Sequence, residues 1–172
     1  MVSRAAPCSL PASSQLRGSL ARIDYIDSYE VPVTRDGMSL IGIYAAALDY
    51  LPGVFKQLLV VRSTLVKPFG IGGVSYRELT DPIDTGKRYA VGDKLGRWTI
   101  YSIAEDEIIT GANDKHLDFR VSVLREEGRR VVLSTAVMTH NRLGRGYLAA
   151  ILPFHKFGVA QLLTNASAAG RI

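Results

Sequence analysis

The chain has 172 residues, 47% hydrophobic and 22% charged, a balance typical of one globular domain. Its single cysteine, Cys8, excludes an internal disulfide and paired thiol ligands for zinc, and predicts a cytoplasmic location. The net charge of +5 permits anionic partners, but the basic residues are scattered without interleaved aromatics, so we expect no nucleic-acid binding. We also expect no membrane segment, because no stretch approaches the roughly 18 apolar residues that a span needs.

The chain opens with a segment of different character from the rest. Residues 1–21 are rich in Ser, Ala and Pro and lack the continuous apolar stretch of a secretory signal. We interpret them as an irregular arm, either mobile or docked on a neighbouring subunit, followed by a single domain over 22–172. Residues 22–33 alternate as a strand, which we place at a sheet edge because Pro32 cannot donate to a ladder.

Two helices are predicted next. Asp36 is a suitable N-cap for the first, and Pro52 ends it and can open the second. Each carries an apolar stripe at helical spacing. The first stripe consists of Ile41, Tyr44, Ala45 and Leu48, and the second of Phe55, Leu58, Leu59 and Leu65.

The second half of the chain predicts a run of strands and a final helix. Residues 74–96 indicate loops, with one short strand near Arg88–Val91. The helical pattern from about residue 143 contains Pro153, which predicts a kink or a break. Short connections favour hairpins, so we predict an α+β fold in which an antiparallel sheet is covered by a long C-terminal helix. The predicted strands are 97–103, 107–113, 115–126 and 129–140.

The last hairpin defines two faces of the sheet. With Gly128 in the left-handed position of its loop, Arg125 faces Arg129 and Asp114 faces His140. One face is then apolar and the other carries His116, Asp118 and Arg120. The polar face is a solvated surface, a subunit contact or an active or ligand site. Ala136 and Met138 within it hint at cover by a loop, the N-terminal arm or a second subunit.

The candidate catalytic residues are His116, Asp118 and His140, because a histidine beside a carboxylate can act as an acid/base pair. A zinc site would require tertiary convergence of the three histidines, since no metal-binding spacing occurs, and we predict no metal and no cofactor. Asn141 is a candidate cap of the final helix, and Arg145 lies where an anion could bind. His155 is either a polar group on the helix face or a probe into a cavity.

Five stretches together resemble a bacterial family known only as a domain of unknown function, which also occurs fused to NAD-dependent epimerase-like domains. The resemblance runs from about Ile23 to Leu163. The family is in turn similar to the START-like, helix-grip (SRPBCC) superfamily. The chain lacks the fused dinucleotide-binding portion, so the resemblance implies no nicotinamide cofactor. The stretches are "YIDSYEV", "RSTLVKPFG", "VGDKLGRWTI", "DKHLDFRVSV" and "THNRLGRGYLAAILPFH".

The superfamily resemblance implies a cavity between sheet and C-terminal helix that binds a hydrophobic or amphipathic small molecule. The alternatives are a cyclase, dehydratase or hydrolase that uses a His–Asp pair, and an interaction domain that forms a homodimer. The expected ligand-binding residues are Phe119, Val121, Thr135, Val137, Asn141, Arg145, Tyr147, Ile151, Phe154 and His155.

Overall fold

The computed structural model describes residues 4–35, 37–48, 82–127 and 129–172. The predicted cap Asp36, the predicted helix that begins at Pro52 and the loop residues up to 81 lie outside the described residues.

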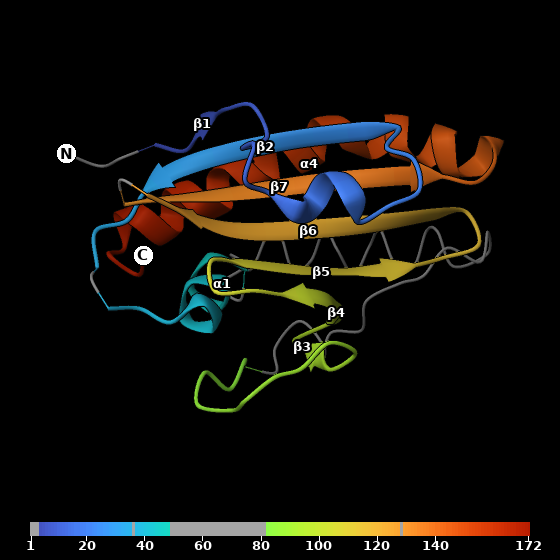
Figure 1. Ribbon diagram of the computed structural model, residues 1–172. Coiled ribbons are helices and arrows are strands. Elements are labelled where there is room, and N and C mark those ends of the chain that lie inside the picture. The colour runs from blue at the N-terminus through green and yellow to red at the C-terminus, as the bar shows by residue number, and fades with distance from the viewer. Residues whose placement is uncertain (1–3, 36, 49–81, 128) are drawn as a thin grey trace.

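The described strands form one antiparallel sheet in the order β1-β2-β7-β6-β5-β4-β3 (Figure 1). Together with the C-terminal helix, it confirms the predicted α+β fold and is consistent with a helix-grip arrangement. The strands are β1 (Ala6–Pro7), β2 (Tyr25–Pro32), β3 (Lys94–Leu95), β4 (Trp98–Ile103), β5 (Glu107–Asn113), β6 (Leu117–Glu126) and β7 (Arg130–Thr139).

The helices lie on opposite faces of this sheet. In Figure 1 the long helix α4 (Arg142–Ala168) runs behind the strands, and the short 3-10 helix η1 (Gln15–Gly18) lies in front of them. Helix α1 (Leu40–Leu48) packs on the α4 side, where its Tyr44 hydroxyl lies 2.9 Å from Thr110 Oγ1 of β5. We call the α4 side the inner face and the η1 side the outer face.

The inner face carries the main core. Because strand side chains alternate between faces, one apolar series along β2, β6 and β7 turns toward α4 and α1. Leu163 and Ala166 of α4 are fully buried against them. The central strand residues of this core are Tyr29, Val31, Val121, Val123, Val131 and Leu133.

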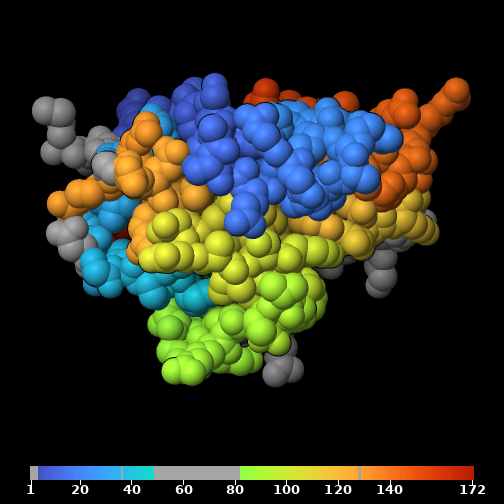
Figure 2. All heavy atoms as spheres, viewed as in Figure 1, coloured from blue at the N-terminus to red at the C-terminus, as the bar shows by residue number. Residues whose placement is uncertain are grey.

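The N-terminal arm covers the outer face of its own sheet. Leu16 and Leu20 pack there against Ile109 of β5 and Ala136 of β7. In Figure 2 the blue N-terminal segment spreads over the front of the sheet. The outer face is the predicted polar face, for which the sequence allowed contact with water, with a second subunit or with a ligand. Its centre is covered by residues of the same chain.

Several sequence predictions need correction. Strand β2 is not the edge of the sheet, because β1 pairs with it at Tyr29 and Glu30. The short strand lies at Lys94–Leu95 and not near Arg88–Val91. Helix α4 continues through Pro153 without a break. In the predicted stripe of α1, Tyr44 and Leu48 are buried as expected, whereas Ile41 and Ala45 are only partly buried. The helix also buries Leu40, Ile43 and Ala47.

The register of the last hairpin also differs from the prediction, by two residues. Arg125 faces Val131, and Arg129 adopts a left-handed conformation with φ 62°, while Gly128 lies outside the described residues. The faces were nevertheless predicted correctly, because a shift of two residues preserves the side of every side chain. Asp114 therefore does not face His140. The His140 backbone N–H donates to the His116 carbonyl instead.

Candidate functional site

The predicted catalytic residues lie at the end of the sheet where β6 begins and β7 ends. Nε2 of His140 lies 3.1 Å from Oδ1 of Asp118, so this predicted pair is in contact. Nδ1 of His116 instead lies 3.0 Å from Nδ2 of Asn141. The His140 side chain is 34% exposed. The structure thus joins two of the three candidates at an open edge and turns the third toward the start of α4.

Asn141 fixes the beginning of α4, as predicted. Its Oδ1 accepts a hydrogen bond from the Gly144 backbone N–H at 2.9 Å, and its Nδ2 donates to the Lys115 carbonyl. The helix passes so close to β6 here that a Cβ on Gly144 would overlap the carbonyl oxygen of His116. Only glycine permits this approach, so residue 144 determines how α4 meets the sheet.

A polar cluster that the sequence analysis missed lies on the inner face. The Tyr25 hydroxyl donates to Oδ2 of Asp27 at 2.6 Å, and Nε2 of His155 on α4 lies 3.3 Å from Oδ1 of the same carboxylate. Burial, followed by the hydrogen bond to Asp27, raises the pKa of the Tyr25 phenol. The available signal was the strand period, since Asp27 falls among the inward positions with Tyr25 and Tyr29.

The predicted ligand-binding residues divide between burial and exposure. On the inner face Val121, Thr135 and Val137 are buried, and Oγ1 of Thr135 has no hydrogen-bond partner within the described part of the chain. Thr135 stands opposite Asp27 in the β2–β7 ladder. On α4, Phe154 is 71% exposed. Phe119, Tyr147, Ile151 and His155 are half-buried, while Arg145 is exposed.

A second buried carboxylate lies on the outer face. Glu107 of β5 accepts hydrogen bonds from the Ser14 hydroxyl at 2.6 Å, the Gln15 backbone N–H at 2.7 Å and the Ser122 hydroxyl at 2.5 Å. The residue is 4% exposed. Because Ser14 and Gln15 belong to the arm, this carboxylate attaches the arm to the sheet.

Arg120 is buried on the same face. Its guanidinium stacks 3.4 Å from the centre of the Tyr101 ring and donates to the Phe119 carbonyl at 2.8 Å. Burial lowers the pKa of this guanidinium. The predicted polar face is therefore an ordered, covered surface at these positions.

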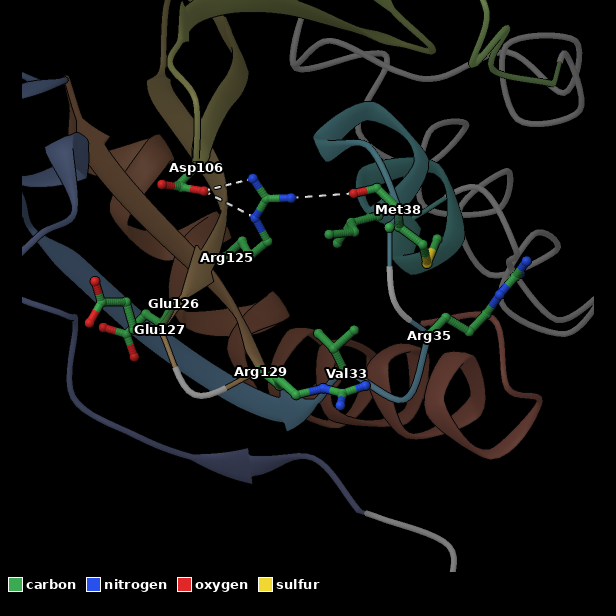
Figure 3. Close-up of a pocket in the computed structure, with 10 residues that line it drawn as sticks. Val33, Arg35, Met38, Asp106, Arg125, Glu126, Glu127 and Arg129 are labelled. Atoms are coloured by element: carbon green, nitrogen blue, oxygen red, sulfur yellow. Dashed lines mark hydrogen bonds and ion pairs between the residues drawn. The ribbon is translucent and has the colours of Figure 1, made fainter.

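A pocket of about 300 Å³ lies at the opposite end of the sheet from His140 (Figure 3). It is formed where β2 ends, where α1 begins and where β6 turns into β7. Val33, Met38 and Ile43 supply its apolar surface. The charged residues that line it are Arg35, Asp106, Arg125, Glu126, Glu127 and Arg129.

Several of the charges that line the pocket are held by ion pairs. Arg125 donates to Asp106 at 2.8 and 3.0 Å and reaches the Met38 carbonyl at 3.3 Å. Glu126 is bound by Arg130 outside the pocket at 2.9 Å. In Figure 3, Glu126 and Glu127 point away from the hollow, and the Arg35 side chain also extends away from it, whereas the Arg129 side chain lies beside Val33. The arrangement therefore presents an apolar surface with the Arg129 guanidinium at its edge.

The described residues also bear on metal binding and on membrane crossing. No group of three or more His, Cys, Asp or Glu side chains among these residues could hold a metal ion. None of the described helices has both the length and the apolar character that crossing a membrane requires.

Taken together, the fold and these sites define an α+β protein with a seven-stranded antiparallel sheet between a C-terminal helix and an N-terminal arm, as far as the structure describes it. The chain belongs to the family described as "Protein of unknown function (DUF2867)", whose model matches residues 19–162. This match confirms the predicted membership of a family of unknown function. No curated protein and no solved structure matches the chain.

Proposed function

We propose that this protein binds a small amphipathic molecule with a negatively charged group, in the pocket between β2, α1 and the β6–β7 turn. The observation that carries the proposal is the pocket itself. Its volume of about 300 Å³ falls at the lower end of the size range of ligand sites, and it combines an apolar surface with a few convergent charges. The START-like resemblance supports small-molecule binding by analogy of fold alone. It implies a different location, between the sheet and the C-terminal helix, and none of the ligand-binding residues expected from it lines this pocket.

The two sides of the pocket suit two parts of one ligand. Val33, Met38 and Ile43 would take an apolar body, which gains free energy as it leaves water. Arg129 would take a carboxylate, sulfonate or phosphate, because a guanidinium forms paired hydrogen bonds with such groups. Binding that depends on this exposed charge weakens as salt concentration rises.

The conformation of Arg129 supports its role in the pocket. A left-handed φ of 62° is costly for a residue with a Cβ, and such backbone strain is concentrated at functional positions. The Arg129 carbonyl also accepts a hydrogen bond of 2.7 Å from the Val33 backbone N–H. The strained residue is thereby joined to the apolar side of the pocket.

The test is titration with anilinonaphthalene sulfonate, an amphipathic anion that fluoresces in apolar sites, followed by displacement with octanoate. Arg129→Asn removes the charge and keeps a residue that accepts left-handed backbone, so it should fold and bind about tenfold more weakly. Met38→Glu should abolish binding by placing an anion against the ligand. Arg88→Asn, at an exposed arginine outside the pocket, is the matched control.

Equal affinity in the wild type, Arg129→Asn and Met38→Glu would refute the pocket as the binding site. Native mass spectrometry of protein from its own host then identifies the natural ligand class, since a bound molecule adds mass that denaturation removes. The same spectrum reports whether subunits pair, which the dimer hypothesis predicts.

A further inference from the structure

The cluster of Tyr25, Asp27 and His155 lies away from the pocket and has no part in the proposed binding. Asp27 is a carboxylate on the inner face of β2, in the series that also contains Tyr29 and Val31 of the core. Its side chain is 13% exposed. A carboxylate in this position loses much of its hydration, so the groups around it determine what it can do.

The contacts on Asp27 orient the His155 ring. Tyr25 occupies Oδ2 at 2.6 Å, which leaves Oδ1 for Nε2 of His155 at 3.3 Å. The Tyr25 ring also meets the imidazole edge-on, with an interplanar angle of 83°. When the imidazole is neutral, the carboxylate therefore places the proton on Nε2 and leaves the lone pair on Nδ1.

The surroundings add a cation and keep the histidine accessible. Nζ of Lys156, the next residue of α4, lies over the Tyr25 ring at 6.0 Å from its centre. The His155 side chain is 23% exposed, so a small molecule can reach it. A base, an orienting carboxylate and a nearby ammonium group are the parts that proton transfer on carbon requires.

We propose that His155 is a general base, positioned by Asp27, that moves a proton within a small carbonyl compound. Nδ1 of His155 takes a proton from the carbon next to the carbonyl, and the electron pair of that C–H bond forms an enolate. The ammonium of Lys156 stabilises the negative oxygen. Nδ1 then returns the proton to carbon, so the reaction needs no oxidant, reductant or second substrate.

The first experiment needs no substrate. Isotope-edited NMR of the histidine rings reports which nitrogen carries the proton, and we expect Nε2–H for neutral His155 in the wild type. Asp27→Ala should produce a mixture of the two tautomers, because Nε2 then has no carboxylate oxygen to donate to. A neutral His155 with its proton on Nδ1 in the wild type would overturn the proposal.

The second experiment measures exchange of the protons next to a ketone with deuterated water, using benzylacetone and levulinate as probes. We expect the wild type to accelerate exchange of at least one probe, His155→Gln to lower that rate about a hundredfold, and Lys156→Gln about tenfold. Lys87→Gln is the control, because Lys87 also lies over a tyrosine, at 5.2 Å from Tyr89. No acceleration by the wild type, or an unchanged rate in His155→Gln, would refute the assignment.

The two proposals fail separately. Arg129→Asn acts on the pocket and should leave the exchange rate unchanged, and His155→Gln should leave binding of the fluorescent anion unchanged.

Discussion

The two faces of the sheet each hold a buried carboxylate, and the two are bound in different ways. Glu107 on the outer face receives three hydrogen bonds from groups that stay uncharged, two hydroxyls and a backbone N–H. Asp27 on the inner face is held by a tyrosine and a histidine, which can both change protonation. A carboxylate saturated by neutral donors stabilises structure, whereas one held by titratable partners is suited to moving protons.

The largest expected effect is at Glu107. Glu107→Leu would leave the buried Ser14 and Ser122 hydroxyls and the Gln15 N–H without an acceptor, so we expect the free energy of unfolding to fall by about 3 kcal/mol. Urea denaturation measures the change. The control Glu127→Leu, at an exposed glutamate, should stay within about 0.5 kcal/mol of the wild type. A loss below 1 kcal/mol on that scale would mean that Glu107 does not hold the arm.

A smaller effect is expected where α4 meets β6. Gly144→Ala forces the helix away from the His116 carbonyl and should cost about 2 kcal/mol. Gly146→Ala has open space around the added methyl and should stabilise α4 by about 0.5 kcal/mol. Thermal unfolding distinguishes the two variants. Equal shifts of their midpoint temperatures would show that the close contact at Gly144 does not restrict the side chain at that position.

Asp27→Asn should change stability least. The amide can still accept from Tyr25, so we expect a change of about 1 kcal/mol or less in the free energy of unfolding. The comparison of faces fails if this loss matches that of Glu107→Leu, because Asp27 would then be as structural as Glu107. Urea denaturation of both variants under the same conditions makes the comparison direct.

The stability of the protein should also depend on pH through the inner face, where Tyr25 contacts Asp27. The pKa of Tyr25 is raised in the folded protein by burial and by Asp27, so folding favours the neutral phenol. Its contribution is fully present below the ordinary tyrosine pKa of about 10 and is lost as pH rises above it. Asp27→Asn should lower the pKa of Tyr25 toward its ordinary value and so make that loss smaller. Alkaline titration of tyrosine absorbance together with circular dichroism tests both statements.

The strand pattern predicted the sheet well because alternation is a strong local signal. Val121 and Val123 were assigned to the correct face although the register was displaced by two residues. The displacement arose in the loop, where Gly128 was the expected left-handed residue; Gly128 lies outside the described residues, and Arg129 adopts a left-handed conformation. Local preference could not predict this, because tertiary contacts stabilise the strained residue.

The sites were predicted less well, because each depends on residues far apart in sequence. His155 and Asp27 are 128 residues apart, and only the packing of α4 on β2 brings them together. The arm was expected to be irregular, yet Leu16 and Leu20 stand four residues apart and both pack on the sheet. That spacing was an available signal of docking. The pocket is formed by three separate segments of the chain, so no continuous sequence motif indicates it.

Helix α4 is attached to the sheet at both of its ends. Its first turn is fixed by the cap of Asn141 and by the close approach of Gly144, and its last turns are buried in the core around Leu163. With a rise of 1.5 Å per residue, His155 lies about 20 Å along the helix from the first attachment and about 12 Å from Leu163. A helix held at two points cannot tilt without disturbing the core. The distance between His155 and Asp27 is therefore set by the packing of the whole helix, and a substitution at either attachment should alter it.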